Sequence, residues 1–230
     1  MKIHIIHRTE CEKACGLCVV IDVLRAFTTA AFAFAGGAKE ITLVGTKDEA
    51  FKKFKEDQNL LLMGEENRGM LIEGFHYGNS PYEIHRADIA ERCFVQRTSS
   101  GTQGVVGCAH ADHMLVSSFV VAEATLKRII AINPEHVSFI VTGMHDGDED
   151  LALAEYLKSR LIKGLVSLDP YLDRVKNSHG GKKLIERSHE PDYIHGPRDL
   201  EFAVDADRFS FAMEVFKVNS HLVARKVIVE

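Results

Sequence analysis

Short apolar runs alternate along this chain with longer segments in which apolar residues recur at helical spacing. The short runs predict strands, and the longer segments predict helices. The predicted strands cover residues 2–6, 18–23, 39–44, 60–63, 93–96, 114–117 and 137–141, and the predicted helices cover residues 24–35, 47–56, 81–90, 101–109, 120–132 and 151–162. Such alternation predicts an α/β fold with a largely parallel sheet flanked by helices.

The last third of the chain has a weaker pattern. From Asp169 onward the sequence predicts short helices, two turns and a last strand, with the turns at Gly180–Gly181 and Gly196–Pro197 and the strand at Ala224–Val229. We therefore divide the chain into an α/β region, 1–165, which carries the candidate phosphate-binding segments described below, and a smaller α/β C-terminal part, 166–230. This part is expected to pack on the same domain or to form a small second lobe. Its histidines have no ligand spacing and are expected at the surface: His179, His189, His195 and His221.

Composition and charge are ordinary for a soluble globular protein, with 46% hydrophobic residues, 27% charged residues and a formal net charge of −5. The negative charge gives no support for a nucleic-acid partner. No apolar run approaches the ~20 residues of a membrane span, and the apolar part of the N-terminal segment is too short for a signal peptide. We expect a cytoplasmic protein with reduced cysteines and no membrane partner. A homo-oligomer is compatible with the sequence, which does not determine it.

Three cysteines have the C-x3-C-x2-C spacing of radical S-adenosylmethionine enzymes, at Cys11, Cys15 and Cys18. Three thiolates at this spacing could hold three irons of a cubane cluster. However, Cys18 runs directly into an apolar strand, and free cysteines are commonly buried structural residues. A structural zinc would need a fourth ligand that does not stand out nearby. An iron–sulfur enzyme is therefore a remote alternative.

Polar residues follow the strand predicted at residues 18–23 and open the next helix. Asp22 could hold a metal, act as a nucleophile, or cap the helix while pairing with Arg25. The Arg25 guanidinium could hold a phosphate bidentately, and the Thr28 hydroxyl could add a donor at the helix N-terminus. Ligands in open parallel sheets bind where strands end and helices begin, so this junction is a candidate site.

A glycine-rich segment, residues 64–81, follows the strand at 60–63 and is long for a loop inside a compact domain. It begins with Gly64 and Glu65 and ends in Asn79-Ser80-Pro81, where Ser80 could cap a helix. Glu65 is a candidate metal ligand, and Asn79 and Ser80 are candidate phosphate ligands. The alternative is a surface loop that contains turn residues only.

Hydroxyl residues and a glycine follow the strand at 93–96. Backbone N–H groups and hydroxyls in such a turn converge on an anion, which predicts a phosphate cradle made of Thr98, Ser99, Ser100, Gly101 and Thr102. The lysine of a P-loop is absent, so the turn is not interpreted as a nucleotide site. A plain helix-capping turn is the alternative.

The strand at 137–141 leads into Thr142 and then into an acidic run that ends with Glu149 and Asp150. Acids in the first turn of a helix favour the helix dipole, yet Asp150 could also reach a metal. Because the carboxyl ends of parallel strands share one edge of a sheet, we expect the junctions around Asp22, Glu65, Thr98 and Thr142 to lie together.

Three of these segments resemble the 2-phosphosulfolactate phosphatase family: V-I-D-V-L-R-A at 20–26, G-E at 64–65 with G-F-H-Y-G-N-S-P at 74–81, and T-S-S-G-T at 98–102. The resemblance covers about residues 18–155. It implies a magnesium-dependent hydrolase that removes phosphate from 2-phospho-3-sulfolactate, a step toward coenzyme M. The chain departs from the family pattern at several positions: His76 stands where the family usually has Asp, Ser99-Ser100 where it has Thr-Asn, and Thr142 where it has Cys, and the loop from Thr142 to Asp150 is shorter.

Our working hypothesis places Mg²⁺ among three carboxylates, Asp22, Glu65 and Asp150, with Asp22, Arg25 and Asp150 as the catalytic residues. The predicted phosphate ligands are Arg25, Thr28, Asn79, Ser80, Thr98, Ser99, Ser100, Gly101 and Thr102. An aspartyl-phosphate route normally uses a D-x-D pair, and position 24 is Leu, so metal-activated water is favoured. Arg68 and Arg97 are candidates for a second anion site. The other functions left open are a phosphatase for a different small phospho-acid and an inactive binder of a phosphorylated ligand.

Overall fold

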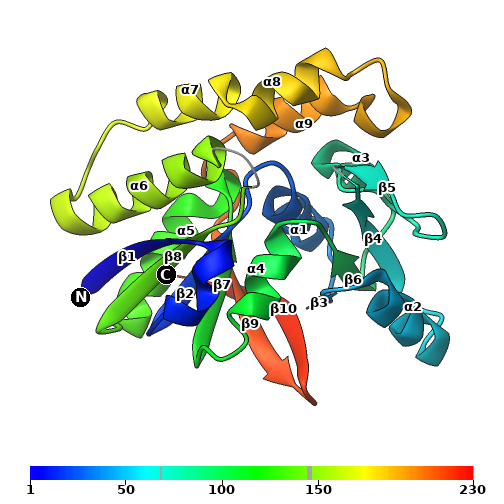
Figure 1. Cartoon of the computed structure of the whole chain (residues 1–230), viewed down its shortest axis with the longest axis horizontal. Helices are drawn as coiled ribbons and strands as arrows, with labels where there is room; N and C mark the ends of the chain where they lie inside the picture. The colour runs from blue at the N-terminus through cyan, green and yellow to red at the C-terminus, as the bar shows by residue number, and fades with distance from the viewer. Residues whose placement is uncertain (68, 144–146, 230) are drawn as a thin grey trace.

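The computed structural model describes residues 1–67, 69–143 and 147–229. Within these ranges, ten strands form one mixed sheet in the order β1-β8-β2-β7-β9-β10-β3-β6-β4-β5 (Figure 1). In chain order they are β1 Lys2–His7, β2 Leu17–Ile21, β3 Glu40–Leu43, β4 Leu61–Glu66, β5 Met70–Leu71, β6 Cys93–Arg97, β7 His113–Ser117, β8 His136–Val141, β9 Phe211–Val218 and β10 His221–Ile228. The predicted α/β class is confirmed.

The helices of the described residues cover both faces of the sheet and its ends. They are α1 Ala26–Ala35, α2 Lys47–Glu56, α3 Pro81–His85, α4 Gly101–Gly107, α5 Ala122–Ile132, α6 Asp148–Lys163, α7 Asp169–Asn177, α8 His179–Glu186 and α9 Gly196–Ala203, with short 3-10 helices η1 Arg8–Lys13, η2 Phe119–Val121 and η3 Pro191–Tyr193. None of these helices is long and apolar enough to cross a membrane.

The sheet consists of two parallel halves joined by an antiparallel hairpin. The strands β1, β8, β2 and β7 pair in parallel, and so do β3, β6 and β4. Between these halves, β9 and β10 pair antiparallel with each other, with β7 and with β3. Three antiparallel pairings in a row reverse the strand direction from one half to the other. The prediction that all four polar junctions share one edge of a single parallel sheet is therefore wrong in that form.

Both hairpin strands come from the C-terminal part, which thus contributes the centre of the sheet. The sequence predicted β10 but missed β9, because a charged residue, Glu214, interrupts the apolar pattern of Phe211–Val218. The Glu214 side chain is buried, and its Oε2 accepts a hydrogen bond from Arg128 Nη2 of α5 at 2.6 Å. An ion pair with a residue 86 positions earlier in the chain has no local signature in the sequence.

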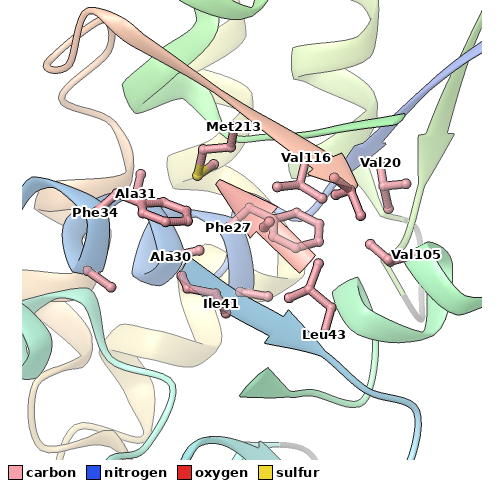
Figure 2. Packing of buried hydrophobic residues seen from close by; sticks show 14 of the residues in the cluster. Val20, Phe27, Ala30, Ala31, Phe34, Ile41, Leu43, Val105, Val116 and Met213 are labelled. Atoms are coloured by element: carbon pink, nitrogen blue, oxygen red, sulfur yellow. The ribbon is translucent and has the colours of Figure 1, made fainter. Parts of the chain in front are cut away.

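Helix α1 is the centre around which the two halves of the sheet are arranged. Every residue from Ala26 to Phe34 is buried, so the helix is enclosed on all sides; it is apolar except for Thr28 and Thr29, whose hydroxyls donate to backbone carbonyls. Its core cluster takes Val20 and Val116 from one half and Ile41 and Leu43 from the other, with Met213 of the hairpin between them (Figure 2). Since both halves pack on one helix, the sheet curves around α1.

The outer faces of the two halves are covered by different helices. Leu17, Val19 and Ile21 of β2 pack in a cluster with apolar residues of α5 and α6, whereas Cys18 and Val20 point to the α1 side. Strand β2 is therefore buried on both faces, as is usual for a central parallel strand. On the other half, a smaller cluster joins α2 to β4 and β6.

Helices α7, α8 and α9 lie together across the top of the molecule in Figure 1. The turn predicted at Gly180–Gly181 is wrong, because both glycines belong to the first turn of α8, where Ser178 Oγ accepts a hydrogen bond from Gly181 N at 2.9 Å. A Cβ on Gly181 would lie 2.4 Å from Val175 O of α7, and one on Gly180 would lie 3.0 Å from Glu149 Oε1 of α6. These glycines allow α8 to pack closely against its neighbours.

Candidate active site

A pocket lies where the C-terminal ends of β2, β4, β6 and β8 come together beneath α8. The curvature of the sheet around α1 brings the ends of both halves to this place, although the halves run in opposite directions. Seven of the predicted site residues line it: Asp22, Arg25, Glu65, Asn79, Ser99, Ser100 and Asp150. The expectation that the polar junctions meet is thus fulfilled by curvature rather than by a common sheet edge.

Asp22 lies at the end of β2 and is 4% exposed. Its Oδ1 accepts a hydrogen bond from Ala26 N, the first residue of α1, at 3.0 Å. A Cβ on Gly101 would lie 2.9 Å from Asp22 Oδ2, so the start of α4 also approaches this carboxylate. The pKa of Asp22 is raised to about 6, mainly by burial; the backbone N–H groups of Ala26 and Gly101 oppose this rise, and the carboxylates of Glu65 and Glu149 contribute to it.

Asp150 connects the ends of β2 and β8. Its Oδ1 accepts from Val23 N at 2.8 Å, and its Oδ2 accepts from Thr142 N at 3.1 Å. Burial raises the pKa of Asp150 well above its ordinary value, and the negative charges of Asp22 and Glu149 contribute. The Thr142 hydroxyl lies 2.8 Å from Ile21 O and 3.2 Å from Asp150 Oδ2. Thr142, one of the departures named from the sequence, therefore helps to orient Asp150 at the start of α6.

Glu65 links β4 to the turn that follows β6. Its Oε1 accepts from Ser99 N at 2.5 Å, and its Oε2 accepts from Gly69 N at 2.8 Å and from Ser99 Oγ at 3.1 Å. The side chain is buried, and the three bonds hold it in one orientation at the pocket. Its charge is one of the influences that raise the pKa of Asp22.

A fourth carboxylate, Glu149, lines the same pocket and was not among the predicted site residues. Its position in the first turn of α6 favoured the helix-dipole explanation, which gave no reason to select it. The side chain is 9% exposed, and its charge raises the pKa of both Asp22 and Asp150. Four buried carboxylates therefore meet in one pocket, which is an arrangement that a cation would stabilise.

The residues present fit a Mg²⁺ ion in their chemistry. Mg²⁺ prefers oxygen ligands and commonly uses one or two carboxylates together with several waters. Asp22, Glu65 and Asp150, all within the described ranges, do not bring one oxygen each within 4.8 Å of one another. A site with one or two of them as direct ligands is compatible with this spacing. In addition, the buried Asn79 Oδ1, which belongs to a pocket-lining residue, has no hydrogen-bond partner in the described part of the chain.

Arg25 reaches the pocket while paired with an acid from the C-terminal part. Its Nη1 donates to Asp199 Oδ2 at 2.7 Å, and both side chains are buried. Asp199 Oδ1 also accepts from Ser80 Oγ at 2.6 Å and from Tyr82 N at 3.2 Å. Asp199 thus connects Arg25 to the start of α3. The sequence could not reveal this connection, because Asp199 lies 174 positions after Arg25.

Several predicted phosphate ligands use their side chains for local structure instead of lining the pocket. Thr28 Oγ1 donates to Val23 O at 2.7 Å, and Ser80 Oγ, besides bonding Asp199, accepts from Glu83 N as the cap of α3. Thr98 and Thr102 form reciprocal bonds around the start of α4, with Thr98 N donating to Thr102 Oγ1 and Thr102 N donating to Thr98 Oγ1. These four side chains shape the turns that present Asp22, Asn79 and Ser99.

Helix α8 contributes basic residues, and the short helix η3 an aromatic one, that the sequence did not single out as ligands. His179, which was expected only at the surface, is exposed but lines the pocket, and so do Lys183 and Tyr193. The Arg25 guanidinium and the Lys183 ammonium lie 5.3 and 5.1 Å from the centre of the Tyr193 ring. The C-terminal part therefore closes the pocket on the side that faces the carboxylates.

Three further residues that the sequence analysis named are Arg68, Arg97 and His76. Arg68 lies outside the described residues. Arg97 donates from Nη1 to Glu65 O at 2.7 Å and does not line the pocket in the described part of the chain. His76, another of the departures named from the sequence, accepts a hydrogen bond at Nδ1 from Leu62 N at 3.0 Å. A carboxylate could accept the same bond, so this departure leaves the pocket lining unchanged.

The cysteines of the C-x3-C-x2-C segment do not form a cluster site. Cys11 and Cys18 are buried, and Cys15 is exposed. Among the described residues, these three thiols are not a group whose sulfurs lie within 4.8 Å of one another. The iron–sulfur alternative is therefore wrong, for the reason visible in the sequence: Cys18 belongs to the buried strand β2.

Comparisons with known proteins agree with the resemblance. A family model described as 2-phosphosulpholactate phosphatase matches residues 3–215. A protein of Bacillus subtilis (strain 168) described as a probable 2-phosphosulfolactate phosphatase is 38% identical over 173 residues, which cover 73% of this chain and 74% of that protein. Proteins with the same description from Thermotoga petrophila and Clostridium perfringens (strain SM101) are 30% and 32% identical, over 85% and 64% of this chain and 87% and 61% of theirs. The family match includes α8 and Asp199.

Proposed function

This chain belongs to the 2-phosphosulfolactate phosphatase family, and we propose that it hydrolyses 2-phospho-3-sulfolactate to 3-sulfolactate and phosphate with Mg²⁺ as its cofactor. The observation that carries this proposal is one pocket with two kinds of lining. Four buried carboxylates lie at the ends of the strands and on α6, and the side chains of Arg25 and Lys183 lie in the same pocket.

The charge balance of the pocket supports a cation. A phosphate ester that also carries a carboxylate and a sulfonate is strongly anionic, and the four carboxylates would repel it. Carboxylates drawn from Asp22, Glu65 and Asp150 would hold Mg²⁺, and its charge would offset this repulsion. When bound, Mg²⁺ supplies neutralisation of the phosphoryl oxygens and Lewis-acid activation of the attacking water.

The protein's own residues bind and orient the substrate. Arg25, fixed by Asp199, offers its remaining guanidinium N–H groups to the phosphoryl oxygens. Ser100 is the N-cap residue of α4 and lines the pocket, so its hydroxyl can donate to an anion, whereas Ser99 donates its N–H and hydroxyl to Glu65. The buried Asn79 Oδ1 is an acceptor, so an ordered water that donates to it would satisfy this oxygen.

The two acidic groups at the other end of the substrate need cations away from the carboxylates. Lys183 and His179 project from α8 into the pocket and meet this need. We assign Lys183 to bind the sulfonate or the carboxylate of the substrate, and we place His179 beside the same group. The aromatic ring of Tyr193 holds Lys183 and Arg25 in place through cation–π contacts of 5.1 and 5.3 Å.

The test is phosphate release by the purified protein from 2-phospho-3-sulfolactate and a panel of small phospho-acids, with Mg²⁺ and with a chelator. Release that requires Mg²⁺ and is fastest with phosphosulfolactate is the expected result. Faster release from another phospho-acid would keep the phosphatase and change its substrate. A protein that releases no phosphate from any member of the panel, while still folded, would overturn the proposal.

A further inference from the structure

Three metal-ligating side chains meet at the end of the sheet opposite to the pocket. They are His4 of β1, His136 at the start of β8, and Cys15 in the segment between η1 and β2. His136 is the first residue of β8, and Gly143, which lines the pocket, follows the end of the same strand. The cluster and the pocket are therefore roughly 20 Å apart along β8. In Figure 1 the start of β1, marked N, lies far from α8, which covers the pocket. We call these three residues the His–Cys cluster.

The spacing of the ligand atoms matches a tetrahedral zinc site. With Zn–N of about 2.0–2.1 Å and Zn–S of about 2.3 Å, two ligand nitrogens lie about 3.3 Å apart and a nitrogen and a sulfur about 3.6 Å apart. His4 Nε2 lies 3.3 Å from His136 Nδ1, and Cys15 Sγ lies 3.6 Å from the same Nδ1. All three ligand atoms lie within 4.8 Å of one another.

The fold holds the three residues in this arrangement through the backbone. In the parallel pairing of β1 with β8, Lys2 lies beside His136 and His4 beside Ser138, so the two histidines are diagonal neighbours on one face. Ser138 Oγ accepts from Cys15 N at 3.1 Å and donates to Cys15 O at 2.9 Å. These two hydrogen bonds between the Ser138 hydroxyl and the Cys15 backbone fix the cysteine beside His136.

A glycine allows this close approach. Gly16, which follows Cys15, has φ of +69°, and a Cβ at this position would lie 2.2 Å from His136 O. Any other residue would push the segment away from β8 and separate the thiol from the imidazoles. The approach of the segment to β8 thus depends on a residue without a side chain.

We propose that His4, Cys15 and His136 bind one transition-metal ion of the zinc class. Imidazole and thiolate ligands select zinc and similar ions over Mg²⁺, which prefers oxygen. The cluster lies at the surface, so water can occupy the fourth position. Binding replaces the hydrogen bonds among these side chains and releases the thiol proton to solvent. The ion would tie the edge strand β1 and the Cys15 segment to β8.

The test is a titration of the reduced, chelator-treated full chain with Co²⁺ in buffer that contains excess Mg²⁺. We expect one Co²⁺ per chain, with the visible bands of tetrahedral cobalt and a near-ultraviolet thiolate-to-cobalt band, both removed by added Zn²⁺. Cys15→Ser should abolish the thiolate band, and His4→Gln and His136→Gln should weaken binding more than about tenfold. The matched controls Cys93→Ser and His113→Gln, at residues outside the cluster, should keep the wild-type spectrum.

Two results would overturn this assignment. One is a wild-type protein without a thiolate-to-cobalt band, and the other is a band that survives in Cys15→Ser. Circular dichroism checks that each variant is folded, which is expected because the altered side chains lie at the surface. The readout is spectroscopic and uses no substrate, so its failure is distinguishable from a failure of the phosphatase proposal.

Discussion

The two ends of the half-sheet formed by β1, β8, β2 and β7 carry different sets of ligands. At the C-terminal end, the pocket gathers buried oxygen ligands whose burial and negative charges raise the pKa values of Asp22 and Asp150. At the N-terminal end, the His–Cys cluster gathers nitrogen and sulfur ligands at the surface. Burial makes the difference, because carboxylates removed from water need a cation, whereas exposed imidazoles and thiols are stable without one. The two ends lie roughly 20 Å apart along β8, so variants of either end should leave the other end unchanged.

The largest expected effect is that of Asp22→Asn. The amide keeps the bond from Ala26 N but removes the charge that meets the cation and the phosphoryl group. We expect kcat/KM for phosphosulfolactate to fall by about 10³-fold or more. Steady-state phosphate release measures it, with Asp112→Asn as an exposed control. Cobalt binding at the His–Cys cluster should not change. Turnover near the wild-type rate would refute any catalytic role for Asp22.

The second prediction concerns Asp199, a positioning residue. Asp199→Asn leaves the buried Arg25 without its counter-charge, so the free energy of unfolding should fall by about 3 kcal/mol. Chemical denaturation measures this change. Removing both charges with Arg25→Met and Asp199→Asn, which keeps an oxygen for the Ser80 hydroxyl and the Tyr82 N–H, should restore much of the stability but not the turnover. If the double variant recovered turnover as fully as stability, this result would contradict the role of Arg25 in binding phosphate.

The third prediction is a dependence of stability on pH that Mg²⁺ suppresses. The pKa of Asp22 in the folded protein is about 6, above its ordinary value of 3.8. Ionised Asp22 therefore lowers the free energy of unfolding, whereas protonated Asp22 does not. The penalty is absent below about pH 4, grows as the pH rises, and is complete above about pH 6, where it reaches about 3 kcal/mol. Melting curves of the Mg²⁺-free protein at pH 5 and pH 8 measure it. Mg²⁺ should raise the melting temperature more at pH 8 than at pH 5. An equal rise in melting temperature with Mg²⁺ at both pH values would show that the ion does not contact Asp22.

The smallest effect is expected from Lys183→Ala. Loss of one cation near the acidic end of the substrate should raise KM about tenfold, with a smaller change in kcat. A phosphate ester that lacks the sulfonate and the carboxylate should be affected less. The neighbouring exposed Lys182 provides the matched control, Lys182→Ala. If Lys182→Ala raised KM as much as Lys183→Ala, the effect would reflect general charge and not a contact in the pocket.

Residues next to the ends of strands could be predicted, and those that reach the pocket from distant helices could not. Asp22, Glu65, Ser99 and Asp150 were found because an apolar strand followed by polar residues is a local pattern. Lys183 and Asp199 belong to α8 and α9, where the helices present ordinary amphipathic sequences. Thr28 and Ser80 were overvalued as ligands, because a hydroxyl at a helix start serves capping and ligand binding equally well.

The local patterns of the sequence determined the strands β1–β4 and β6–β8, the helix α1 and the acids at the ends of the strands, but not the short strand β5, Met70–Leu71, which lies in the segment predicted as a loop. Only the tertiary structure decided that the β9–β10 hairpin enters the centre of the sheet and that the sheet curves around α1. Strand direction, curvature and the approach of α8 depend on contacts between residues far apart in the chain. Such contacts have no periodicity in the sequence, and therefore the sequence predicted that the strand-end segments meet but not how they meet or which residues of the C-terminal part complete the pocket.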